Sequence, residues 1–161
     1  MKKQLALLIL VLALVLSSCV RTPKIPSTKE ILLSLTASQK ALPAGQLYST
    51  DLEITDRNYL SDTLLISYFG EPNIAKYKES WLSVSIFMPS GSAADEIAVI
   101  FCSTPEALID TARLLSTRLD SVKRLFGDKL PEHKIITHGN YACLLICGDV
   151  KTAEKTIKKM C

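Results

Sequence analysis

The chain has 161 residues, of which 19 are Lys or Arg and 16 are Asp or Glu, so its formal net charge is +3, and 48% of its residues are hydrophobic. This length fits a single domain and is too short for the two-lobed clamp of a typical transporter-associated binding protein. No basic run of the kind that follows nucleic-acid phosphates is present, so no nucleic-acid partner is expected.

The N-terminal segment has the parts of a secretion signal. Lys2 and Lys3 precede an uncharged apolar stretch, residues 5–16, and two serines follow it. A helix that spans a bilayer needs about 20 apolar residues, so a permanent membrane span is the weaker interpretation. We therefore expect residues 1–18 to be a signal peptide, whose removal leaves 17 basic and 16 acidic residues, a net charge of +1.

The sequence Leu16-Ser17-Ser18-Cys19 resembles the lipobox of bacterial lipoprotein precursors, an aliphatic residue and two small residues before a cysteine. The resemblance implies that the Cys19 sulfur receives a diacylglyceryl group and that the chain is cut just before it. Two or more acyl chains suffice for stable anchoring in a membrane. Residues 19–27 are then a tether between the membrane and a domain over residues 28–161. The alternative is ordinary secretion, with Cys19 as a free thiol.

Two helices are predicted in the first half of the domain. Ser27 and Glu30 have the spacing of a capping box and predict a helix over about residues 28–41. Ser61 and Gly70 are placed as the N-cap and the C-terminal stop of a second, shorter helix. Residues 47–58 are too mixed to assign.

The middle of the chain carries the strongest patterns. Residues 81–88 and 96–102 are predicted strands, and the second is apolar on both faces, which indicates a central strand. Ser103 and Glu106 are placed as the capping box of a long helix, in which apolar residues recur every three or four positions until Gly127.

The last part predicts a hairpin and a helix. Residues 134–137 and 141–147 read as its two strands, and Asp149 can cap the final helix. An alignment that places Cys102 on Cys147 suggests that the second half is a shorter ββα repeat of the first. The expected fold is α+β: a four-stranded antiparallel sheet in hairpin-helix-hairpin-helix order, with the helices packed on one face.

Two stretches, "SAADEIAVIFCSTPEALIDTARLLSTRLDSVKRLF" and "LPEHKIITHGNYACLLICGD", together with the lipobox, are similar to small Gram-positive lipoproteins catalogued as a domain of unknown function. The similarity covers about residues 60–160. Its marks are the Ser-Ala-x-Asp-Glu-Ile-Ala strand entry, the long helix and the Gly-Asn-Tyr hairpin. The resemblance implies the α+β architecture and carries no activity.

Four cysteines remain in the domain: Cys102, Cys143, Cys147 and Cys161. Cys143 and Cys147 lie four positions apart on one predicted strand, about 13 Å, too far to bond to each other. Buried free thiols are the first interpretation, and a cross-strand disulfide involving Cys102 is the alternative. Cys161 is expected to be exposed and able to pair between molecules after oxidation.

No catalytic or metal-binding pattern is found, and no cofactor is expected. His133 and His138 flank a short strand without a third metal ligand, and they are predicted to be solvated. A nucleophile pair of Cys143 with His138 is conceivable, but Cys143 lies in an apolar run, where burial makes a thiol inert. There is no nucleophile elbow and no phosphate-binding loop.

Asp95, Glu96 and Trp81 are the candidate residues for a surface site. As neighbours at a strand entry, Asp95 and Glu96 point to opposite faces and are predicted to form a solvated edge. Trp81 is predicted to fill the core, and a sugar-binding platform is the alternative.

These observations favour a membrane-anchored, non-enzymatic interaction or accessory module of the cell envelope, held by lipid on Cys19 and binding an envelope protein or polymer. The alternative is a small-ligand-binding lipoprotein or a minor envelope enzyme, with its site over the open sheet face or near Asp95 and Trp81.

Overall fold

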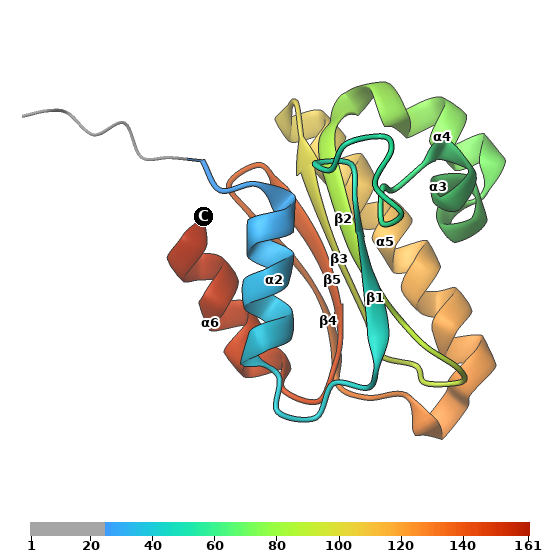
Figure 1. Cartoon of the computed structure of the whole chain (residues 1–161), viewed down its shortest axis with the longest axis vertical. Coiled ribbons are helices and arrows are strands. Elements are labelled where there is room, and N and C mark those ends of the chain that lie inside the picture. The colour runs from blue at the N-terminus through green and yellow to red at the C-terminus, as the bar shows by residue number, and fades with distance from the viewer. Residues whose placement is uncertain (1–24) are drawn as a thin grey trace, which may run out of the picture.

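The computed structural model describes residues 25–161, so the predicted signal peptide and Cys19 lie outside the described residues. The helices are α2 (Thr28–Ser38), α3 (Asp62–Phe69), α4 (Glu71–Tyr77), α5 (Pro105–Phe126) and α6 (Val150–Met160). The strands are β1 (Gly45–Ser49), β2 (Trp81–Pro89), β3 (Glu96–Cys102), β4 (His133–His138) and β5 (Tyr141–Ile146). They form one antiparallel sheet in the order β1-β2-β3-β5-β4 (Figure 1). The predicted α+β class is confirmed, with five strands in place of four.

The helices cover both faces of this sheet, which corrects the prediction of a single covered face. On one side α2 and α6 pack over Ile97 and Val99 of β3. On the other side α3, α4 and α5 pack over Ala98 and Ile100 of the same strand (Figure 1). Since β3 and β5 are apolar on both faces, each face must be removed from water, and a single helical layer cannot do this.

The two halves of the suggested ββα repeat do not have the same three-dimensional arrangement. Val99 pairs with Cys143, which places these two side chains on the same face of the sheet. Cys102 therefore faces α5, whereas Cys147 packs on the side of α2 and α6. Residues that the alignment matches in β3 and β5 therefore face opposite sides of the sheet. The helices that follow the two hairpins, α5 and α6, accordingly pack on opposite faces.

Strand β1 and helix α4 are the elements that the sequence did not predict. In β1, a Cβ atom on Gly45 would lie 2.5 Å from the Met88 carbonyl oxygen and from the Phe87 ring, so only glycine fits this close approach at the sheet edge. Helix α4 begins directly after Gly70, whose φ of 86° turns the chain sharply between α3 and α4.

Most predicted helix caps are confirmed. The Ser27–Glu30 capping box begins α2, which ends at Ser38, three residues earlier than predicted. Ser61 caps α3 and Asp149 caps α6.

The predicted cap of α5 is wrong by one residue. Thr104 occupies the N-cap position, and its side chain accepts a hydrogen bond from the backbone of Ala107. Ser103 instead donates its hydroxyl to the carbonyl of Ser80, 3.0 Å away, and so ties the start of α5 to the start of β2.

Candidate functional site

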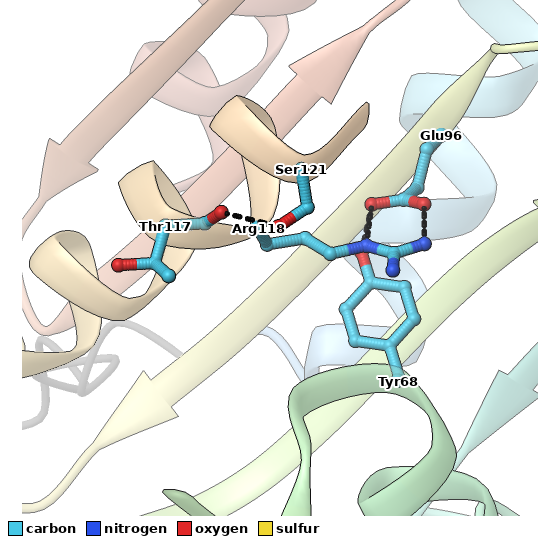
Figure 2. Close-up of polar contacts among 5 residues, drawn as sticks. All are labelled: Tyr68, Glu96, Thr117, Arg118 and Ser121. Carbon is cyan, nitrogen blue, oxygen red and sulfur yellow. Dashed lines mark hydrogen bonds and ion pairs between the residues drawn. The ribbon is translucent and has the colours of Figure 1, made fainter. Parts of the chain in front are cut away.

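Glu96, the first residue of β3, lies at the centre of a buried charged group. Its side chain faces α5 and is only 5% exposed. Arg118 of α5 donates two parallel hydrogen bonds to the two carboxylate oxygens, of 3.1 and 2.7 Å, and the Tyr68 hydroxyl of α3 donates a further one (Figure 2). We call Tyr68, Glu96 and Arg118 the ion-pair cluster. The prediction of a solvated strand edge is wrong for Glu96, because β3 is a central strand and α5 covers its start.

The electrostatics of the ion-pair cluster favour its paired state. The Arg118 guanidinium lies 4.4 Å from the centre of the Tyr68 ring, which adds a cation–π contact to the ion pair. Burial, and then the charge of Glu96, raise the pKa of Tyr68 well above its usual value. Both oxygens of Glu96 accept hydrogen bonds within the cluster, so the buried carboxylate is balanced by Arg118.

A groove of about 190 Å³ lies beside this cluster. Asp95, Glu96 and Arg118 line it together with apolar side chains from the β2–β3 connection and the end of α5, among them Met88, Ala94, Val122 and Phe126. Leu125, also on its wall, is 79% exposed, and partial burial raises the pKa of Asp95. We call this hollow the distal groove.

Trp81 does not belong to that site. It pairs with Cys102 at the opposite end of β3, about 20 Å from Glu96 at the rise of a strand. Its side chain is buried, and the indole N–H donates a 2.8 Å hydrogen bond to the Thr111 hydroxyl. The core-filling interpretation of Trp81 is confirmed, and it cannot serve as an exposed sugar platform.

A second groove, of about 320 Å³, lies at the other end of the sheet. Its lining is Ile25, Pro26, Phe101, Gly139, Asn140, Tyr141, Met160 and Cys161. The rings of Phe101 and Tyr141 stack with centres 4.6 Å apart, and the Tyr141 hydroxyl donates to the carbonyl of Pro26. This hydrogen bond fixes the point where the predicted tether enters the domain, and we call the hollow the tether-end groove.

Polar side chains also gather under the start of α2, where no sequence pattern predicted a site. The Thr28 hydroxyl lies 2.9 Å from an Asp51 carboxylate oxygen, 2.9 Å from the Ser83 hydroxyl and 2.8 Å from the Ser85 hydroxyl. Ser85 in turn donates to Ser49, 2.7 Å away. We call these five residues the hydroxyl cluster. The two serines that alternate with apolar residues in "WLSVSIF" are the sequence signal that could have revealed it.

The four cysteines of the described residues are free. Cys102 lies on the α5 side of the sheet, whereas Cys143 and Cys147 lie on the α2 side, so the sheet separates Cys102 from the other two. Burial raises the pKa of Cys143 strongly and that of Cys147 to about 11. Buried free thiols are confirmed, and a Cys143–His138 nucleophile pair is not supported, since Cys143 is fully buried.

Within residues 25–161 no cluster of three or more His, Cys, Asp or Glu side chains could hold a metal ion. Among the helices of these residues, none has the length and hydropathy of a bilayer-spanning segment. Every buried side-chain nitrogen and oxygen there has a hydrogen-bond partner, so neither polar cluster contains an unpaired buried group that a ligand would satisfy.

The described chain is thus an α+β domain with a five-stranded antiparallel sheet between two helical layers, and a groove at each end of that sheet. No family model matches the chain, and no curated protein or solved structure matches it either.

Proposed function

We propose that this protein is a lipid-anchored, non-enzymatic accessory domain of the bacterial cell envelope, attached to the membrane through Cys19 and binding an envelope protein or polymer. The observation that carries the proposal is the lipobox-like Leu16-Ser17-Ser18-Cys19, which stands seven residues before Pro26. Pro26 is held by Tyr141, so the folded domain begins almost directly after the proposed anchor. A chain of this length spans at most about 25 Å, which keeps the domain at the membrane.

The binding role is supported by the distal groove. Two of its three charged members, Glu96 and Arg118, are paired with each other, which favours recognition over proton transfer by this pair. The groove, at about 190 Å³, is smaller than the 300–1,000 Å³ or so of typical small-molecule pockets. Leu125 stands exposed on its wall beside Val122 and Phe126, and an apolar patch that rims a groove is typical of a surface that a protein partner covers. An envelope partner is therefore favoured over a small ligand.

The anchor is tested by intact-mass analysis of membrane-extracted protein. The expected chain starts at Cys19 and carries the added mass of acyl chains. Cys19→Ala removes the sulfur that accepts the lipid, so this variant should leave the membrane fraction or remain an uncut precursor. Cys161→Ala is the matched control, because it removes an exposed cysteine that the lipobox does not contain. A cleaved Cys19→Ala chain that still binds membranes after a high-salt wash would contradict the proposal.

The partner is tested by chemical cross-linking in intact cells that express the anchored protein. We expect wild type to capture a specific envelope component and Leu125→Glu, at the distal groove, to capture at least about tenfold less, as for a central interface residue. Leu33→Glu is the matched control, since Leu33 is also exposed but lies on α2. Capture of no envelope component by abundant wild-type protein would count against a binding role.

A further inference from the structure

Exposed aliphatic side chains occur at the tether end of the sheet. Ile25 is 66% exposed, Leu82 is 61% exposed and Ile54 is 77% exposed. Leu82 follows Trp81, the residue that pairs with Cys102 at this end of the sheet. Ile54 belongs to the loop after β1, and the bridge between Ser49 and Tyr59 closes the base of this loop. The loop lies at the same end of the sheet as the start of α2 (Figure 1). Three large apolar side chains from separate segments are therefore presented at one end.

The tether-end groove lies at the same end of the sheet and shares Ile25 with this set of side chains. Ile25 lines it together with the apolar and aromatic side chains of Pro26, Phe101, Tyr141 and Met160. The carbonyl of Asn140, at its rim, already accepts a hydrogen bond from the backbone of Cys102. The groove thus offers hydrocarbon and aromatic surface with few free polar groups, which suits an acyl chain better than a polar ligand.

The charges around this end do not favour an electrostatic partner. The backbone N–H of Lys29 donates to Asp51, and Lys78 pairs with Asp62 beside Leu82, so the two signs are mixed. A surface that binds anionic lipid headgroups or nucleic acid needs several clustered cations. The force available here is burial of apolar surface.

The length of the tether limits where this end can lie. Pro26 is fixed to Tyr141 on the rim of the groove, and Cys19 is seven residues away. If Cys19 carries lipid, as proposed above, the groove stays within about 25 Å of the bilayer surface. Confinement at this distance gives a high effective concentration, so even a weak apolar contact becomes populated.

We propose that the tether end of the domain is a membrane-docking surface, on which Ile25, Ile54 and Leu82 insert into the hydrocarbon boundary of the same bilayer that holds Cys19, and the tether-end groove accepts lipid hydrocarbon. This inference rests on the proposed lipid anchor. Docking in this orientation turns the distal groove away from the membrane, because Glu96 and Phe101 stand at opposite ends of β3. The envelope partner would then approach from the side opposite the lipid.

The test places one tryptophan at each end of the lipidated full-length protein. Ile54→Trp reports the tether end, and Leu125→Trp is the matched control at the distal groove, since the two native side chains are 77% and 79% exposed. Each variant is reconstituted into phosphatidylcholine vesicles with or without bromine on the acyl chains, which quenches nearby indoles. Trp81 is buried in both and gives a common background.

Insertion by about 5–10 Å should reduce the added Ile54→Trp emission at least about twofold in brominated vesicles and leave Leu125→Trp unchanged. The expected contrast should persist in high salt, because no ionic attraction is involved. Equal quenching of the two variants, or none in either, would overturn the docking surface. Intact mass and co-flotation with the vesicles are measured first: protein without acyl chains that fails to float contradicts the anchor, whereas floating, acylated protein without the contrast contradicts only the docking.

Discussion

The hydroxyl cluster and the ion-pair cluster lie on opposite faces of one sheet. Both provide hydrogen-bond partners for buried polar side chains, but they do so with different groups. Under α2, the hydroxyl cluster joins neutral groups such as Thr28 and Ser85 to one accessible carboxylate, that of Asp51. Under α5, the ion-pair cluster buries the charge of Glu96 and must supply Arg118 to balance it. Loss of a neutral member costs a hydrogen bond, whereas loss of one charge leaves another without its partner. The two faces should therefore tolerate substitutions very differently.

The largest effect is expected from Arg118→Leu, which keeps much of the apolar stem and removes the charge. Glu96, which is 5% exposed in the native structure, would lose its bidentate partner, and we expect the free energy of unfolding to fall by about 3 kcal/mol. Urea unfolding monitored by circular dichroism measures this. Arg113→Leu is the matched control on the same helix, since its bond to Asp110 is on the surface, and should change stability by less than about 0.5 kcal/mol. Equal losses in both variants would remove the distinction between buried and exposed pairs.

A smaller loss is expected from Thr28→Val. The substitution preserves shape but removes the hydroxyl that joins Asp51, Ser83 and Ser85, so the free energy of unfolding should fall by about 1–2 kcal/mol. Thr36→Val on the same helix is the control, because the Thr36 hydroxyl bonds only the carbonyl of Leu33. If Thr28→Val lowered the free energy of unfolding as much as Arg118→Leu, the loss of a neutral hydroxyl would be no less destabilising than the loss of a buried charge.

Tyr141, on the same face of the sheet as the hydroxyl cluster, makes stability depend on alkaline pH. Burial raises the pKa of Tyr141 to about 12, from about 10 in an unfolded chain. The unfolded state then loses its proton first, so the stability linked to this phenol is fully present below pH 10 or so and is lost as the pH rises toward 12. At pH 11 the loss should reach about 1 kcal/mol or less.

Tyr141→Phe tests this assignment. Its stability should decline less steeply than that of wild type between pH 9 and pH 11, as measured by urea unfolding at each pH. Parallel curves for the two proteins would mean that Tyr141 does not titrate in this window.

Local patterns predicted much of the fold because capping and periodicity act over a few residues. Helix α5 was predicted from apolar residues three or four apart and a stop at Gly127, and the structure ends it at Phe126. Strand β1 was not predicted because its sequence is short and mixed. It is a strand because it pairs with β2, where Gly45 allows close contact with Phe87. The two-sided covering of the sheet was missed as well, although the apolar faces of β3 already required it.

The ion-pair cluster was beyond local patterns for a different reason. Glu96 stands 22 positions before Arg118 and 28 after Tyr68, so only the packing of α3 and α5 on β3 brings them together. A signal did exist: Arg118 lies on the same helical stripe as Leu115 and Val122, where an apolar residue is usual. A charge in an apolar stripe, beside an apolar strand that starts with the opposite charge, indicates a buried pair.

The smallest loss of stability is expected from Glu154→Gln, which removes one carboxylate charge from the surface of α6. Hydrogen bonds from Lys134 and Lys158, of 2.6 and 2.8 Å, lower the pKa of Glu154 to about 2. The stability linked to this carboxylate is therefore present above the unfolded pKa of about 4.3 and is lost as the pH falls toward 2. Because water and salt screen both lysines, wild type and Glu154→Gln should unfold at nearly the same urea concentration at pH 7, and any difference should vanish in high salt. Glu96→Gln, which removes the same charge under α5, should unfold at clearly lower urea in either salt. If Glu154→Gln were the more damaging of the two, burial would not decide the cost of losing a charge in this domain.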